Sequence, residues 1–243
     1  MLSFVTSDGV RLAYADEGEG RPVLLLHGFL SSGHRNWSRL IPALTGAGLR
    51  VIAPDCRGHG ASDAPTAPEA WPADVMARDV LELAAQLGLS DFDLVGYSMG
   101  GRTAIRAMVG GLKPRRLVIG GMGEFGVMEA GPRAEAFEDA LRHGEAASDP
   151  GMGRAIANAL AAQGLKAQAM LGVLASFQLT TEAEIRALRT DALVILGTED
   201  HDNGSGQVLA DWLGGRFLPL PGDHGQVPAS PAFVEAVVEF LSP

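Results

Sequence analysis

A single cysteine, Cys56, is present among the 243 residues, so no intrachain disulfide can form. Positive charge is also scarce, because 19 Lys and Arg stand against 29 Asp and Glu, which gives a formal net charge of −10. No stripe of basic residues offsets this balance, and phosphate groups repel an acidic surface. We therefore expect neither nucleic acid nor a membrane surface as a partner.

Long apolar runs are missing as well, since no stretch approaches the length that spans a bilayer. The first nine residues have neither the basic start nor the apolar run of a signal peptide. With 47% hydrophobic and 20% charged residues, the composition is close to that of a soluble globular domain. These features together predict a cytoplasmic protein.

Short apolar runs alternate with helical patterns along most of the chain, which is typical of a mostly parallel sheet with helices on both faces. The central runs are apolar at every position, as in strands buried on both sides. The predicted strands are Arg11–Ala15, Val23–Leu26, Val51–Pro54, Phe92–Gly96, Leu117–Gly120, Leu193–Leu196 and Phe217–Pro219. The predicted helices are Trp37–Ala47, Pro72–Leu87, Met99–Val109, Ser205–Leu213 and Pro231–Leu241. The sequence thus predicts an α/β fold.

Residues 122–189 break this alternation. They contain no convincing strand, only an Ala-rich helical pattern interrupted by Gly-Pro, Asp-Pro-Gly and Gln-Gly. We expect residues 1–121 and 190–243 to form the α/β core, and 122–189 to form a helical insertion over one end of the sheet.

The segment Gly96-Tyr97-Ser98-Met99-Gly100 contains a Gly-x-Ser-x-Gly pattern. A predicted buried strand ends at Gly96, and a predicted helix begins at Met99. A serine in such a tight turn needs small neighbours, and its hydroxyl would lie at the positive end of the helix, where an oxyanion is favoured. This context, more than the pattern alone, predicts Ser98 as a nucleophile.

A serine hydroxyl needs a base that takes its proton. Of the six histidines, His224 follows the last predicted strand and precedes the last predicted helix. A loop in that place lies at the carboxyl ends of the strands, the edge at which Ser98 emerges. We therefore predict His224 as the base.

The base must in turn be oriented by an acid. Asp200 comes three residues after the glycine that ends the strand Leu193–Leu196. Glu199 and Asp202 lie beside it, and Glu124 follows the preceding strand at the same edge. Asp200 is the predicted acid, and the other three carboxylates stay as alternatives.

Two backbone N–H groups must hold the oxyanion of a tetrahedral intermediate. One is predicted to be that of Met99, directly after the nucleophile. The other is predicted to be that of Phe29, because Gly28 lets the chain turn there after the strand Val23–Leu26. The Phe29 side chain could either line a pocket or pack in the interior.

Together these segments resemble the α/β-hydrolase superfamily over nearly the whole chain. His27-Gly28-Phe29 resembles its oxyanion loop, residues 53–63 resemble the loop after its fourth strand, and residues 96–100 resemble its nucleophile elbow. The order Ser, Asp, His along the chain is also that of the superfamily. The resemblance implies a Ser-Asp-His carboxylesterase-like enzyme with a helical cap at 122–189 and no metal or organic cofactor.

Some residues differ from those of particular members of this superfamily. Related sequences often continue after the acid with Pro and a short apolar stretch, whereas this chain has His201-Asp202-Asn203, which keeps Asp202 open as the acid. Epoxide hydrolases and haloalkane dehalogenases of this fold carry Asp at the nucleophile position, where this chain has Ser98. Asp55 and Arg57 are interpreted as structural, through turn capping and ion pairing.

The predicted activity is hydrolysis of carboxylic esters of small, fairly apolar substrates through an acyl-enzyme. The same site would also serve a lactone, a thioester or the C–C bond of a ring-cleavage diketone. A third hypothesis, a non-catalytic ligand-binding relative, is disfavoured by the complete set of catalytic residue types. The residues predicted to line the substrate pocket are His27, Phe125, Met128, Met170 and Phe177; Met152 and Leu174 are further apolar candidates in the insertion.

Overall fold

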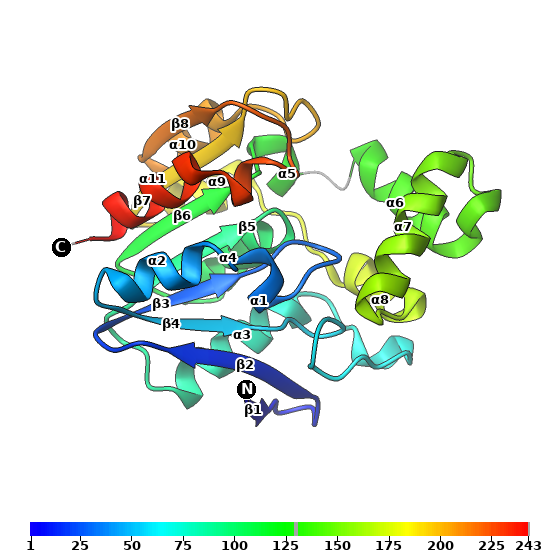
Figure 1. Ribbon diagram of the computed structural model, residues 1–243, viewed down its shortest axis with the longest axis horizontal. Helices are drawn as coiled ribbons and strands as arrows, with labels where there is room; N and C mark the ends of the chain where they lie inside the picture. Colours follow the sequence, from blue (N-terminus) through cyan, green and yellow to red (C-terminus); the bar gives the residue numbers. More distant parts are fainter. Residues whose placement is uncertain (129–130, 243) are drawn as a thin grey trace.

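The computed structural model describes the backbone of residues 1–128 and 131–242, and the side chains of these residues except 131–133. In this part of the chain, eight strands form one sheet in the order β1-β2-β4-β3-β5-β6-β7-β8 (Figure 1). The strands are β1 (Leu2–Val5), β2 (Arg11–Glu17), β3 (Arg21–Leu26), β4 (Leu49–Pro54), β5 (Asp93–Tyr97), β6 (Arg116–Gly120), β7 (Asp191–Gly197) and β8 (Arg216–Leu220). Pairing is antiparallel for β1–β2 and β2–β4 and parallel for the other pairs. The predicted α/β class with a mostly parallel sheet is confirmed.

Helices cover both faces of the sheet, and each face has its own core cluster. One face packs against α3 (Val75–Gln86), α4 (Met99–Val109) and α10 (Gly206–Leu213). The other packs against α2 (Leu40–Gly46) and α11 (Pro231–Leu241). In β3 the side chains of Leu24 and Leu26 enter the first cluster, and those of Val23 and Leu25 the second. This two-sided burial explains why the central strands are apolar at every position.

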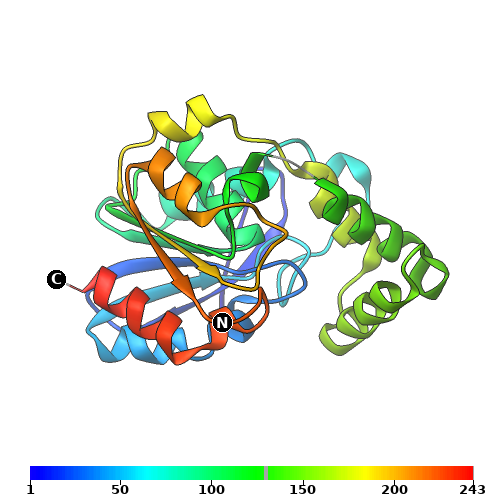
Figure 2. The same ribbon diagram turned by 90° about the horizontal axis from the view of Figure 1, so that it is seen from above.

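Among the described residues between β6 and β7 there are five α-helices: α5 (Glu124–Met128), α6 (Gly131–His143), α7 (Pro150–Gln163), α8 (Ala167–Ser176) and α9 (Glu182–Ala187). Figures 1 and 2 show α6, α7 and α8 beyond the carboxyl ends of the parallel strands. By contrast, α9 packs against α4 and α10, and Ile185 of α9 belongs to the sheet's core cluster. Residues 129 and 130, which fall within the predicted insertion, lie outside the described residues.

Three expectations differ in detail from the structure. The predicted helix Trp37–Ala47 begins only at Leu40, as α2, and the buried Trp37 lies between it and a separate short helix, α1 (Gly33–Asn36). The helix predicted from Pro72 begins only at Val75, because Asp74 has a φ of +60°. Strand β1 was not predicted, since it lies at the sheet edge and only Phe4 of its four residues is buried.

In the described part of the chain, no helix has both the length and the apolar character needed to cross a bilayer.

Candidate active site

Ser98 occupies the turn between β5 and α4, with a φ of +53° and a ψ of −117° that residues other than glycine rarely adopt. Its backbone N–H donates to Gly120 O at 2.8 Å, which ties the turn to β6. A β-carbon on Gly96 would lie 2.4 Å from Gly100 O, and one on Gly100 would lie 2.0 Å from Leu26 O. Both glycines of the motif are therefore required by backbone contact.

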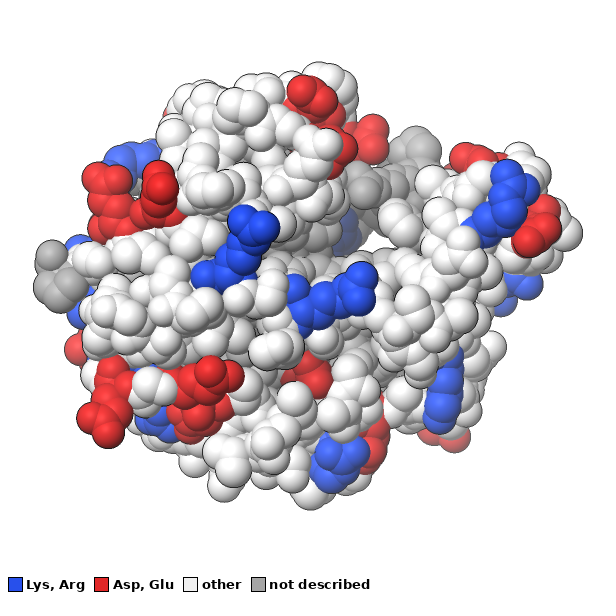
Figure 3. Space-filling view, in the orientation of Figure 1, with Lys and Arg blue, Asp and Glu red and all other residues white. Residues whose placement is uncertain are grey.

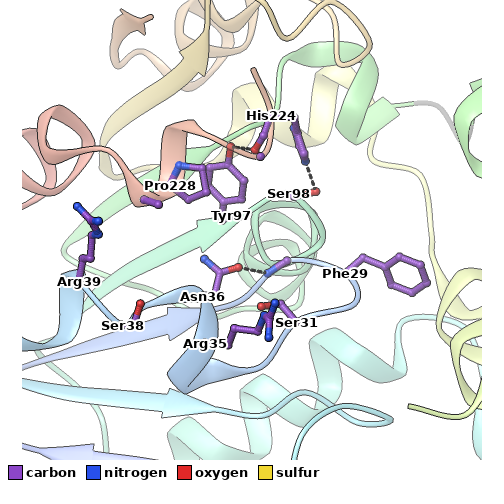
Figure 4. A pocket seen from close by; sticks show the side chains of 13 residues that line it. Phe29, Ser31, Arg35, Asn36, Ser38, Arg39, Tyr97, Ser98, His224 and Pro228 are labelled. Carbon is purple, nitrogen blue, oxygen red and sulfur yellow. Dashed lines mark hydrogen bonds between the residues drawn. The ribbon is translucent and has the colours of Figure 1, made fainter. Parts of the chain in front are cut away.

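Three side chains from distant parts of the sequence form one hydrogen-bonded chain at this turn. Ser98 Oγ lies 2.9 Å from His224 Nε2, and His224 Nδ1 lies 2.6 Å from Asp200 Oδ2. The Asp200 side chain is 1% exposed, whereas that of His224 is 22% exposed. With Nδ1 donating to the buried carboxylate, Nε2 is the nitrogen that accepts from the serine hydroxyl. Figure 4 shows His224 above Ser98, on the side where the strand β5 ends.

The three carboxylates that the sequence offers as alternative acids occupy different places in the structure. Glu124 accepts a hydrogen bond from the backbone N–H of Ser205, which fixes the loop after β7. Glu199 is exposed. Asp202 is exposed as well and lines the cavity described below. Asp200 is the carboxylate in contact with His224.

Asn203 takes part in this arrangement and was missed in the sequence. Its Nδ2 donates to Asp200 Oδ1 at 2.7 Å, and its backbone oxygen accepts from the N–H groups of Gly123 and Gly126. The available signal was its position, three residues after Asp200 in a loop at the carboxyl edge of the sheet. Its amide holds the second oxygen of the buried carboxylate.

The loop after β3 approaches the serine closely. A β-carbon on Gly28 would lie 3.6 Å from Ser98 Cβ. The Gly28 N–H donates to Asn36 Oδ1 at 2.9 Å, which anchors the loop to α1. Phe29, Ser98 and Met99 line one cavity. The Met99 amide belongs to the first turn of α4, where backbone N–H groups have no acceptor within the helix.

This cavity has a volume of about 630 Å³ and is bounded by the sheet edge, α4, α5 and the helices of residues 131–176. Its apolar lining consists of Phe29, Leu30, Met99, Met122, Phe125, Gly126, Ala134, Phe137, Met152, Leu174, Phe177 and Leu179. Its polar lining consists of Ser98, Arg102, Asp202, Asn203 and His224. The Phe29 side chain both lines the cavity and packs against a neighbour, as its ring lies edge-on to that of Phe137, with 5.7 Å between the ring centres.

Three residues predicted for the pocket do not line this cavity. His27 is fully buried, with Nδ1 2.8 Å from Gly28 O and Nε2 accepting from the Cys56 N–H at 2.9 Å. It therefore joins the loops after β3 and β4, and burial lowers its pKa. Met170 is fully buried in the cluster beneath α8, and Met128 packs against the core of the sheet. The predictions of all three as pocket residues are wrong. For the two methionines, the helical pattern does not specify which helix face meets the cavity, and His27 is held in the interior by its hydrogen bonds.

Arg102 is a charged residue of the cavity that sequence reasoning missed. It lies one helical turn after Ser98 on α4, and residues four apart share a helix face. One Nη donates to Gly126 O, and the guanidinium carbon lies 5.1 Å from the centre of the Phe177 ring. Burial lowers the pKa of Arg102 to about 10, so the side chain stays positively charged at neutral pH. A buried cation thus lies close to the serine.

Two residues of the loop after β4, Asp55 and Arg57, hold neighbouring segments in place. Asp55 accepts from the N–H groups of Gly33 and Ala61, at 2.8 Å each. Arg57, whose side chain is fully buried, forms ion pairs with Asp8 and Asp79 at 2.9 and 2.7 Å. Neither residue lines the cavity beside Ser98. Within the described residues, no group of three or more His, Cys, Asp or Glu could hold a metal ion.

Comparisons with known proteins agree with this architecture. Residues 21–108 match the model of the alpha/beta hydrolase fold family. A hydrolase structure from Pseudomonas aeruginosa PA01 is 26% identical, covers 100% of this chain and 98% of its own, and superposes with a TM-score of 0.82. An esterase from Exiguobacterium antarcticum, 22% identical, covers 99% of both chains with a TM-score of 0.80.

The curated proteins that the chain matches first are similar over a shorter stretch, 37–42% of this chain. A putative 2-succinyl-6-hydroxy-2,4-cyclohexadiene-1-carboxylate synthase from Bacillus subtilis is 41% identical over 105 residues, which are 42% of this chain and 37% of that protein. The chain spans between 17% and 37% of the length of the curated relatives that it matches first. With this fold, elbow and family match, the chain belongs to the α/β-hydrolase superfamily.

Proposed function

We propose that the protein is a serine hydrolase that cleaves carboxylic esters of small, fairly apolar substrates through an acyl-enzyme. The observation that carries this proposal is the chain of contacts from Ser98 Oγ to His224 at 2.9 Å and from His224 to Asp200 at 2.6 Å. A buried acid, an imidazole and a serine in that order can activate a hydroxyl that is otherwise inert at neutral pH.

The reaction would begin with attack of Ser98 Oγ on the acyl carbon while His224 Nε2 takes the hydroxyl proton. The backbone N–H groups of Phe29 and Met99 would hold the developing oxyanion. His224 then gives the proton to the leaving alcohol, and a water activated by the same imidazole releases the acid. Asp200 would keep the imidazole in the tautomer that leaves Nε2 free to accept, and would stabilise the imidazolium.

The acyl group would occupy the 630 Å³ cavity. Aromatic and aliphatic side chains supply much of its lining, and burial of apolar surface there would contribute roughly 25 cal/mol per Å². Met152 and Met122 are flexible and adapt to irregular shapes, which favours acyl groups of more than one form. This lining supports a preference for uncharged acyl chains.

The experiment is a panel of p-nitrophenyl esters of increasing acyl length, assayed with the wild-type protein and with Ser98→Ala. We expect turnover of medium-length chains that Ser98→Ala abolishes. A lactone, a thioester and a vinylogous 1,5-diketone belong in the same panel, because the same catalytic groups would act on each. Absence of ester turnover at every chain length, with activity on one of these, would replace the ester proposal by that reaction.

A second candidate is an enzyme whose substrate carries a carboxylate on the part that enters the cavity. The observation that favours it is Arg102, a buried cation in the cavity wall one turn from Ser98. The curated relative from Bacillus subtilis is named for a product that is itself a carboxylate, which is consistent with this candidate. Guanidinium groups bind carboxylates through paired, charge-assisted hydrogen bonds.

Arg102→Met separates the two candidates, with Arg106→Met as its control. Arg106 lies one turn further along α4, pairs with Asp74 and does not line the cavity. If the second candidate holds, a monoester of a dicarboxylic acid should be a better substrate than its neutral counterpart, and only Arg102→Met should remove the difference. An unchanged ratio in Arg102→Met would leave the apolar acyl group as the substrate class.

A further inference from the structure

A second, smaller pocket lies beside Ser98 and His224, between α1 and the loop that follows His224. It has a volume of about 280 Å³. Its lining consists of Gly28, Phe29, Ser31, Arg35, Asn36, Ser38, Arg39, Tyr97, Ser98, His224, Gly225, Pro228 and Ala229 (Figure 4). Phe29, Ser98 and His224 also line the 630 Å³ cavity. The reacting hydroxyl therefore lies where the two spaces meet.

The charge of this pocket is of one sign. Arg35 on α1 and Arg39 just before α2 are part of its lining, which contains no Asp or Glu. In the described part of the chain, neither guanidinium forms an ion pair with a carboxylate. Figure 3 shows basic side chains over the region of α1 and α2. In a protein with a net charge of −10, this is a local concentration of positive charge, which attracts anions.

Asn36 supplies a second, independent observation. Its Oδ1 accepts from the Gly28 N–H at 2.9 Å, so Nδ2 is turned to the other side. Nδ2 is buried and has no hydrogen-bond acceptor among the described residues. Figure 4 shows this nitrogen on the side of Tyr97 and Pro228, away from the Gly28 backbone. A buried donor without an acceptor is unfavourable, and a ligand oxygen would satisfy it.

We propose that this pocket, here called the arginine pocket, binds an anionic group, a carboxylate or a phosphate, carried by the leaving alcohol of the ester. The inference rests on the proposed function. His224 must pass its proton to the leaving oxygen, and the residues that follow it, Gly225, Pro228 and Ala229, form a wall of this pocket. The acyl group then lies in the larger cavity, and the leaving group lies beside the general acid.

The step is an ordinary acyl transfer. The bond from Ser98 Oγ to the acyl carbon forms, and the bond from that carbon to the leaving oxygen breaks. The proton that His224 took from Ser98 goes to the leaving oxygen, so the released alcohol keeps only the charge of its anionic group. Water then releases the acid from Ser98, and no other reactant is needed.

The test compares two esters of nearly the same shape. Both carry a hexanoyl group; the leaving phenol is 4-hydroxybenzoate in one and the neutral 4-hydroxybenzamide in the other. A third ester with a phosphate-bearing phenol shows which anion is preferred. We expect kcat/KM to favour an anionic leaving group by about tenfold, since charge-assisted hydrogen bonds discriminate by at least this factor. The preference should shrink at high salt, because the two arginines are exposed.

Variants connect the preference to the pocket. In Arg35→Gln/Arg39→Gln the ratio of the two kcat/KM values should fall about tenfold, and comparing ratios cancels the intrinsic reactivity of the phenols. Asn36→Asp keeps the oxygen that accepts from Gly28 but replaces the donor by a negative group, so it should lower the ratio too. The control is Lys113→Gln/Arg154→Gln, which removes the same charge at exposed positions outside both spaces and should keep the wild-type ratio.

The outcomes separate this inference from the proposed function. If the neutral ester is hydrolysed with dependence on Ser98 and the anionic one is not preferred, the arginine pocket has no such role. The same conclusion follows if the control variant changes the ratio as much as the arginine variant does. If the preference appears instead for an anionic acyl group, with a neutral phenol, the assignment to the leaving group is overturned. If no ester is hydrolysed, both proposals fall together.

Discussion

Asn203 and His224 share one carboxylate, since each contacts a different oxygen of Asp200, at 2.7 and 2.6 Å. The carboxylate is buried, so both of its oxygens need donors. The Asn203 amide fixes the rotation of the carboxylate, and that rotation sets the position of the imidazole opposite Ser98. Asn203 is therefore a positioning residue for the proposed chemistry.

Replacing Asn203 by Ala should lower kcat for an ester substrate by about tenfold, because a hydrogen bond to a charged group is worth roughly 1.5–3 kcal/mol. The loss should appear in kcat more than in KM, since the ground-state substrate does not need the correct imidazole position. Steady-state kinetics check this, with His201→Ala in the same loop as the control, because His201 is exposed. Equal kcat values in wild type and Asn203→Ala would show that the carboxylate keeps its position without the amide.

The choice of Asp200 as the acid gives a direct comparison of two neighbouring carboxylates. Asp200→Asn should reduce kcat by up to about 10⁴-fold, as replacement of the buried acid does in serine proteases. Asp202→Asn should change kcat by far less, because Asp202 is exposed and Asp200 contacts the imidazole. The reverse result, with Asp202→Asn inactive and Asp200→Asn active, would move the acid role to Asp202.

Part of this site could be predicted from the sequence, and the reasons are local. A glycine-flanked serine between a buried strand and a helix has few conformations, so Ser98 and its strand-to-helix turn follow from residues 91–109. A histidine after the last strand lies at the same sheet edge by topology alone. The apolar central strands predicted a sheet covered on both faces, and that prediction is confirmed.

Other features depend on contacts that no local pattern contains. Four carboxylates follow strands at one edge, and only the three-dimensional loop path brings Asp200 to His224 while Glu124 binds the Ser205 N–H. The methionines of the helical segment all suit an apolar pocket by type. Met152 lines the cavity whereas Met170 is packed in a core cluster, because the crossing of α6, α7 and α8 decides which helix face is covered.

Gly100 tests the packing of the elbow. A β-carbon there would lie 2.0 Å from Leu26 O, so Gly100→Ala must displace β3 or α4. We expect destabilisation of more than about 3 kcal/mol or loss of folded protein. Gly46→Ala is the matched control, because nothing lies within 4 Å of its β-carbon and alanine is favoured in a helix. Urea unfolding measures both, and equal stability of the two variants would contradict the close contact at the elbow.

His59 predicts how stability depends on pH. It is fully buried, and burial, with the nearby His27, lowers its pKa from 6.5 to about 3. The unfolded chain therefore binds a proton between these values that the folded protein does not, so stability falls as the pH decreases below about 6.5. Each such proton contributes about 1.4 kcal/mol per pH unit.

The check is the free energy of unfolding at pH 7, 6, 5 and 4 for the wild type and for His59→Gln. On acidification the free energy of unfolding should fall less steeply in the variant than in the wild type, by about 1.4 kcal/mol per pH unit. This difference in slope is expected whatever the stability of the variant at pH 7. The slope that remains includes His27, whose pKa is also lowered by burial. Identical slopes in the two proteins would mean that His59 stays neutral in the unfolded chain as well, or is protonated when folded.

The most direct measurement for the account as a whole is covalent labelling with a fluorophosphonate, followed by mapping of the adduct by mass spectrometry. If Ser98 is activated by His224 and accessible from the cavity, one adduct should form on Ser98. The labelling should be lost in Ser98→Ala and much slower in His224→Ala. Folded wild-type protein that takes up no label at Ser98, or that takes it up at another residue, would contradict the proposed serine hydrolase.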